Sequence, residues 1–239
     1  GSASFKGDIG IISDSIAAVG TLQHAASKTE VDAKGLAVAP GFINMLAHCE
    51  ESLIEDGKSQ SELREGVTLE VFGESSMGPL TDTLKKEFRE SQADIRYDIA
   101  WTTLGEYLEF LEKKGISTNV ASFVGAGTVR ANVIGYVNRP PTPEELERMR
   151  ALVRQAMEEG ALGLTSALQY VPDVFAKTDE LIALAKAASE YGGIYTSHIR
   201  SEGRHIFESI DELITISEEA RIPAEIYHLE RHLKSIGIG

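Results

Sequence analysis

The sequence predicts an α/β protein and, within that class, an incomplete TIM-like (β/α) barrel of about six strand–helix units. From Phe42 onward, short β-rich apolar runs alternate with helical patterns, which is typical of a parallel sheet covered on both faces. Two of the runs end in histidines, His198 and His228, and barrels place reactive groups at the carboxyl ends of their strands. An open doubly wound sheet is the alternative, but no glycine-rich phosphate fingerprint follows any strand run.

The first part of the chain, residues 5–38, reads as short strands joined by turns. Residues 8–12 and 15–19 flank a polar pair, which is a hairpin signal. Residues 31–32 and 36–38 bracket a second turn in the same way. Because so few strands cannot enclose a core, we expect this segment to pack against the α/β part of the chain.

The clearest helix follows a proline pair near the middle of the chain. Thr142 is its predicted N-cap, Pro143 takes the first helical position and Glu145 completes a capping box. Glycines punctuate the other helical patterns. Strands are expected at residues 39–47, 67–74, 119–125, 161–168, 195–198 and 224–228, with helices at 104–115, 142–160, 181–191 and 206–216.

The composition narrows the function classes. The 239 residues include 37 acidic and 23 basic side chains, giving a formal charge of −14, which disfavours nucleic-acid and membrane-surface partners. Cys49 is the single cysteine, so no intrachain disulfide exists and a reducing compartment fits. No apolar run approaches the roughly 20 residues of a membrane span, and no signal peptide opens the chain. We expect a cytoplasmic protein.

Histidines at strand ends suggest a metal site. His198 and His228 stand at the ends of consecutive strand runs, so their imidazoles are expected to converge on one or two divalent ions, with zinc the first choice. His48, after the first strand run, is the third candidate ligand. Three histidines would leave an open position for a metal-activated water. For each one, a hydrogen-bonded structural histidine is the alternative.

Other polar groups near strand ends are weaker candidates. Glu74 follows the second strand run and is a candidate ligand or general base, with a solvated loop carboxylate as the alternative. Arg200 and Glu202 follow His198, where they either orient substrate or form ion pairs that support the loop. Cys49 is expected to be buried rather than a ligand. No Gly-x-Ser-x-Gly elbow occurs, so a Ser-His-Asp triad has no support.

An ordered set of motifs resembles the N-acyl-D-amino-acid deacylases of the amidohydrolase superfamily, over residues 7–229. The motifs are APGFIN at 39–44, GVT at 66–68, FVGAGTVR at 123–130, GALGLTS at 160–166, HIRSEG at 198–203 and IYHL at 226–229. The resemblance implies a metal-dependent hydrolase barrel with a small β-sandwich built from both chain ends. It therefore predicts a partial sandwich at residues 1–40, a partial barrel with the metal site at 41–230 and an unrelated tail at 231–239.

The sequence departs from the family's pattern at several site positions. The usual His-x-His reads Leu46-Ala47-His48, and Glu74 is the group nearest to the family's bridging cysteine. The lysine two residues beyond the last histidine is replaced by Glu230. The catalytic aspartate on the family's last strand is absent, and the chain resembles a C-terminally truncated member. By analogy Tyr170 is an oxyanion donor or substrate contact, with packing as the alternative.

These features predict a metal-dependent hydrolase in which activated water attacks an amide, ester or phosphotriester-like small molecule. A missing general acid lowers rates by about 10² to 10⁴, mostly for poor leaving groups. We therefore expect activated esters and organophosphates to be the better substrates. Open strand edges predict a homodimer or higher oligomer that completes the barrel. The alternative is a catalytically inactive, self-associating fragment of a D-aminoacylase-like barrel.

Overall fold

The computed structural model describes residues 4–229 and divides the chain into two compact units, Gly1–Pro40 and Gly41–Gly239. Each unit is described by itself. The predicted tail at residues 231–239, and Glu230 before it, lie outside the described residues.

The first unit contains the predicted hairpin. Strand β1 (Asp8–Ile12) pairs antiparallel with β2 (Ser15–Gly20), and Ser13 in the turn takes a left-handed φ of 56°. The second predicted strand pair, at residues 31–38, is wrong: these residues form a turn without strands. No described side chain of this unit is buried. Strand pairing at residues 31–38 would therefore bury no apolar surface that could stabilise it.

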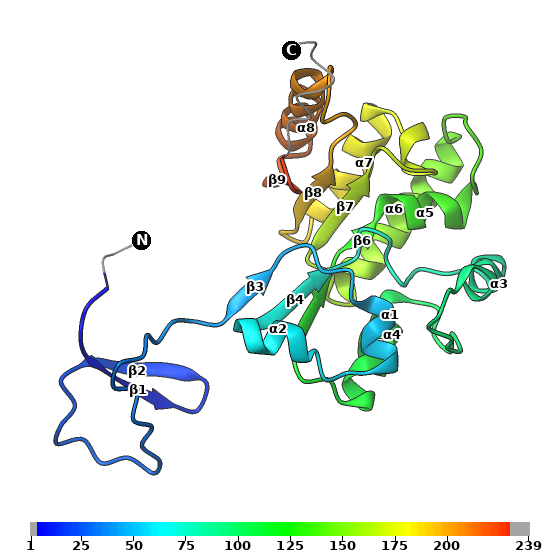
Figure 1. The fold of residues 1–239 in the computed structure, drawn as a ribbon. Helices are drawn as coiled ribbons and strands as arrows, with labels where there is room; N and C mark the ends of the chain where they lie inside the picture. The colour runs from blue at the N-terminus through cyan, green and yellow to red at the C-terminus, as the bar shows by residue number, and fades with distance from the viewer. Residues whose placement is uncertain (1–3, 230–239) are drawn as a thin grey trace, which may run out of the picture. The chain divides into compact units, whose positions relative to one another are not determined.

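The second unit is built on two parallel sheets, one ordered β3-β4-β5 and the other β6-β7-β8-β9 (Figure 1). The parallel α/β class predicted from the sequence is therefore confirmed. The strands are β3 (Phe42–Asn44), β4 (Val67–Phe72), β5 (Asn119–Ser122), β6 (Val124–Gly125), β7 (Gly163–Ala167), β8 (Ile194–His198) and β9 (Ala224–Ile226).

The single strand predicted at residues 119–125 is split at Phe123. The Phe123 N–H donates to the Phe72 carbonyl oxygen at 2.8 Å, and the Leu162 N–H donates to that of Ser122 at 2.9 Å. These two hydrogen bonds connect the two sheets. The strand ends of both sheets therefore belong to one continuous framework.

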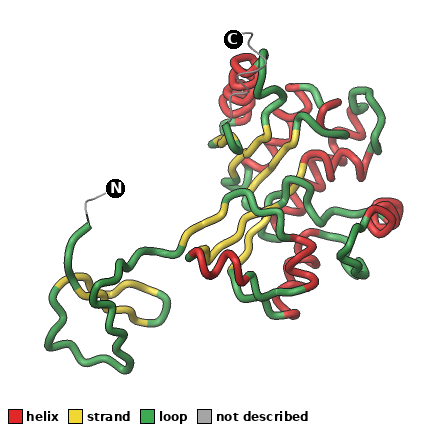
Figure 2. The backbone as a smooth tube through the Cα atoms, in the orientation of Figure 1, coloured by secondary structure: helices red, strands yellow, loops and turns green. Residues whose placement is uncertain are grey.

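Helices cover the strands of this unit, and Figure 2 shows them around the strands. The predicted helices are confirmed, and α4 and α6 have complete capping boxes at Thr103 and Thr142. The helices are α1 (Glu50–Glu55), α2 (Gln60–Glu65), α3 (Asp82–Ser91), α4 (Leu104–Lys114), α5 (Ala126–Val133), α6 (Pro143–Glu158), α7 (Thr178–Ser189) and α8 (Ile206–Ala220), with a 3₁₀ turn, η1, at Asp173–Phe175.

The core of the second unit lies between the strands and their helices. Trp101, Tyr107 and Leu111 are almost fully buried beside β4, and Leu164, Leu181 and Tyr195 are buried around β7 and β8. Within the described residues, no helix combines the length and apolar character that crossing a membrane requires.

Candidate metal centre

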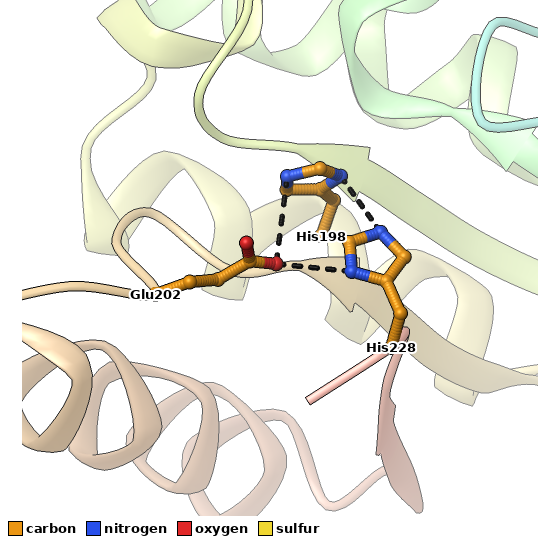
Figure 3. Close-up of side chains that lie close together, drawn as sticks. All are labelled: His198, Glu202 and His228. Carbon is orange, nitrogen blue, oxygen red and sulfur yellow. Dashed lines mark hydrogen bonds and ion pairs between the residues drawn. The ribbon is translucent and has the colours of Figure 1, made fainter. Parts of the chain in front are cut away.

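Two histidines come together at the carboxyl ends of β8 and β9. His198 is the last residue of β8, and His228 follows β9, which pairs in parallel with β8. Nε2 of His228 lies 3.1 Å from Nδ1 of His198, and the rings meet edge to face with centroids 4.5 Å apart (Figure 3). The two imidazoles therefore face a common centre.

Glu74 approaches His198 from a different sheet, although it is not one of the three grouped donors His198, Glu202 and His228. Its Oε1 lies 3.4 Å from Nδ1 of His198. Gly73, directly before it, has a φ of 116°, and a Cβ there would collide with the Phe123 carbonyl oxygen. Only glycine fits this close approach, so the turn that delivers Glu74 depends on Gly73.

Glu202 completes the cluster from the loop after β8. Its Oε1 lies 3.0 Å from Nδ1 of His228 and 3.7 Å from Nε2 of His198 (Figure 3). One ligand atom from each of His198, Glu202 and His228 can be chosen so that all lie within 4.8 Å of one another. Imidazole nitrogens and carboxylate oxygens are ligands that zinc accepts.

The centre has the properties that a cation would satisfy. Oε1 of Glu74 is buried, and it accepts no hydrogen bond within residues 4–229. His198 is only 8% exposed. His228 holds a left-handed φ of 28°, a strained conformation for a non-glycine residue, and such strain gathers at functional sites. These donors, with His198 and the Glu74 oxygen buried and His228 exposed, fit a divalent metal ion.

Tyr170 lies beside the histidine pair. Its ring meets that of His198 edge to face, with centroids 5.3 Å apart, while the side chain remains 59% exposed. The loop carrying it is tied to the ends of β7 and β8, because Leu168 N–H donates to the His198 carbonyl oxygen at 3.0 Å and Ala167 N–H donates to Asp173 at 2.8 Å. Its predicted function as a substrate contact stays a prediction.

Arg200 makes polar contacts with residues outside the metal cluster. Its guanidinium pairs with Glu212 of α8 at 2.9 Å and donates to the carbonyl oxygens of Val174 and Ala176. The ion-pair interpretation of Arg200 thus has a defined partner, and the contacts join the loop after β8 to η1 and α8. Its catalytic function stays a prediction.

The residues around the first strand behave differently. His48 is exposed and is not among the clustered residues His198, Glu202 and His228, so its function as a ligand stays a prediction. Cys49 is half-buried, and burial, together with Glu70 and Glu50, raises the pKa of its thiol. A thiol that resists ionisation is a poor metal ligand.

Two acidic groups near the centre are not marked by any sequence pattern. Glu50 accepts a hydrogen bond from the Gly73 N–H at 3.2 Å, and burial raises the pKa of its carboxyl to about 7. Burial also raises the pKa of Asp173 to about 7. Neither follows a strand directly, so the strand-end signal misses them. Glu202 is predicted only to orient substrate or form an ion pair, although it stands four residues after His198.

Comparison with known proteins places these features in a recognisable group. No protein-family model matches the chain. The chain is 34% identical over 228 residues to a D-aminoacylase from Alcaligenes xylosoxydans xylosoxydans, a match that covers 93% of this chain and 46% of that protein. The chain thus spans about half the length of the curated relatives it matches.

Solved structures give the same picture. A crystal structure of D-aminoacylase, described as defining a novel subset of amidohydrolases, superposes with a TM-score of 0.86 at 30% identity, covering 96% of this chain and 49% of the other. A second structure is N-acyl-D-glutamate deacylase from Bordetella bronchiseptica, in complex with zinc and a phosphonate mimic of the tetrahedral intermediate. It superposes with a TM-score of 0.80 at 26% identity, covering 92% of this chain and 46% of the other.

Proposed function

Because this chain is a homologue of the D-aminoacylases over 93% of its length, we propose that it is a metal-dependent hydrolase of the amidohydrolase type. The observation that carries the proposal is the approach of His228 Nε2 and Glu74 Oε1 to His198 Nδ1 at strand ends, at 3.1 and 3.4 Å, beside the grouped donors of His198, Glu202 and His228. The zinc in the related Bordetella enzyme supports the choice of metal.

His198, His228 and Glu74 would hold the metal in this proposal. When bound, a divalent ion supplies Lewis-acid polarisation of the acceptor oxygen and lowers the pKa of water. Glu74 places a half-buried carboxylate beside His198, where it would also accept a proton. Tyr170, exposed on one side and packed on His198 on the other, is positioned to contact the substrate.

The proposed substrate is a small molecule with an N-acyl bond, as in the deacylases this chain resembles. Activated esters and phosphotriesters are further proposed substrates, because their leaving groups depart without being protonated. The chemistry requires the same centre for both classes, so both activities should depend on the same residues.

The test is zinc content and hydrolysis of N-acyl-D-amino acids and of a nitrophenyl ester. His198→Ala and His228→Ala should each lower zinc content and reduce both activities by more than about 100-fold, beyond the effect typical of outer contacts. His205→Ala is the matched control, since that exposed histidine pairs with Glu208 at 3.3 Å on the surface. Unchanged zinc content and activity in both site variants would refute the proposal.

We also propose that the second unit is part of a (β/α) barrel and that a second copy of the chain covers its edge. The parallel strand order supports the barrel. On the edge strand β3, Phe42 and Ile43 are 58% and 55% exposed. Exposed apolar edge strands favour pairing with another chain.

A further inference from the structure

Glu202 contacts both histidines of the candidate metal centre. It is buried, with 8% of its surface exposed, and lies four residues after His198 in the loop that follows β8. Figure 3 shows its carboxylate on the side of the two rings opposite to their mutual contact. It therefore lies next to Nε2 of His198 and Nδ1 of His228, the two nitrogens that do not face the other ring.

The two carboxylates of the cluster approach opposite nitrogens of His198. Glu74 Oε1 is 3.4 Å from Nδ1, whereas Glu202 Oε1 is 3.7 Å from Nε2. At His228 the division is the same, because Nε2 faces His198 while Nδ1 lies 3.0 Å from Glu202. An imidazole that binds a metal through one nitrogen carries its proton on the other.

The distances from His198 Nδ1 to its two neighbours fit the spacing of metal ligands. Bonds of 2.0–2.1 Å in a tetrahedral site place neighbouring ligand atoms about 3.3 Å apart. The 3.1 Å between the two histidines and the 3.4 Å to Glu74 lie on either side of this value. The 3.0 Å from His228 Nδ1 to Glu202 Oε1 is an ion-pair contact in this structure, at a distance that an N–H···O hydrogen bond can span.

We propose that Glu202 is a positioning residue that accepts the Nδ1 proton of His228, which leaves Nε2 of His228 and Nδ1 of His198 to bind the metal beside Glu74. This inference rests on the proposed metal site. Metal-binding histidines commonly donate their second N–H to a carboxylate, and losing that partner typically lowers metal affinity 10- to 100-fold.

The first measurement uses the metal-free protein. Nitrogen NMR of the imidazole rings reports which nitrogen of His228 carries the proton. The proposal predicts the Nδ1–H tautomer in the unaltered chain and its loss in Glu202→Ala. An Nε2–H tautomer in the unaltered chain, or an unaffected tautomer in the variant, would overturn it.

The second measurement is zinc affinity, with zinc coordination read by X-ray absorption. Glu202→Ala should weaken zinc binding by about 10- to 100-fold without changing the number of protein ligands, and Glu202→Gln should recover part of the loss. Loss of one oxygen ligand, or an unchanged Kd, in Glu202→Ala would overturn the proposal. Glu208→Ala is the control, because Glu208 forms the same kind of pair with His205 at 3.3 Å on the surface.

The two measurements separate this inference from the proposed function. Failure of the unaltered chain to bind zinc would refute the metal-dependent hydrolase. The tautomer of His228 would still decide the position of its proton, and hence the function assigned to Glu202.

Discussion

The hydroxyl of Tyr227 lies 2.7 Å from the hydroxyl of Thr196, and this contact joins β8 to the residue directly before His228. Thr196 is two residues before His198 and so shares its face of β8. Thr165 of β7 lies 3.4 Å from the same phenol, whose ring is buried. The hydroxyl contacts of Tyr227 with Thr196 and Thr165 thus hold the strand ends that carry His198 and His228.

Tyr227→Phe should weaken metal binding. The loss of a buried hydrogen bond costs about 1 kcal/mol, and here it would leave the position of His228 less well fixed. We therefore expect zinc affinity to fall about threefold to tenfold. This is less than the 10- to 100-fold typical of losing a direct partner of a metal ligand. Tyr195→Phe is the control: that buried phenol bonds Ser166 at 2.6 Å but is not adjacent to a site histidine. Equal zinc Kd values for the two variants would contradict this prediction.

Asp173→Asn should remove a pH dependence of stability. Burial raises the pKa of Asp173 from 3.8 to about 7, with Glu180 and Glu74 adding to the effect and the Ala167 N–H and Arg130 opposing it. The folded state therefore binds the proton more tightly, so this residue's stabilising contribution is full below about pH 4 and is lost as the pH rises towards 7.

In the variant, the free energy of unfolding should change less with pH across that window. The slope should fall by the contribution of at most one bound proton, ~1.4 kcal/mol per pH unit. Denaturant unfolding at a series of pH values measures the slope. The amide oxygen of asparagine can still accept from Ala167. An unchanged slope would show that the Asp173 carboxyl titrates normally.

Glu180→Gln should destabilise the second unit strongly. Glu180 is 3% exposed and forms an ion pair with the fully buried Arg130 at 2.6 Å. Arg130 also donates hydrogen bonds to the carbonyl oxygens of Val137 and Arg139. Leaving a buried guanidinium without its counter-charge costs about 3–5 kcal/mol.

Glu147→Gln removes an exposed partner of Arg150 and should cost less than about 1 kcal/mol. Denaturant unfolding of the two variants compares the pairs directly. Similar losses in the two variants would contradict the assignment of Arg130 and Glu180 as a structural anchor.

Ile43→Lys should weaken the proposed self-association. Ile43 lies on the edge strand β3 and is 55% exposed, so lysine there adds charge without emptying the core. Light scattering coupled to size-exclusion chromatography should give a dimer mass for the unaltered chain and a smaller mass for the variant. Phe207→Lys, an exposed change on α8, should keep the dimer. A monomeric unaltered chain would contradict the proposal.

Much of the framework could be predicted because it is encoded locally. The capping box at Thr142 and the apolar spacing of α6 specify that helix without reference to the rest of the chain. The meeting of His198 and His228 follows from one rule, since both stand at the ends of neighbouring parallel strands.

The remainder depends on contacts between distant residues. The break at Phe123 arises from a hydrogen bond to Phe72, about fifty residues earlier, and the α1 and α2 helices are too short for a periodic signal. Glu202 joins the site from a loop whose path no sequence pattern specifies. The buried pair of Arg130 and Glu180 likewise needs the packed structure to be recognised.

Anomalous diffraction from a zinc-soaked crystal tests the proposed metal centre most directly. We predict one strong zinc peak within bonding distance of His198 Nδ1, His228 Nε2 and Glu74 Oε1, with Glu202 bonded to the histidines rather than to the ion. A peak away from this pair of histidines, or no peak at zinc concentrations that saturate related enzymes, would contradict it.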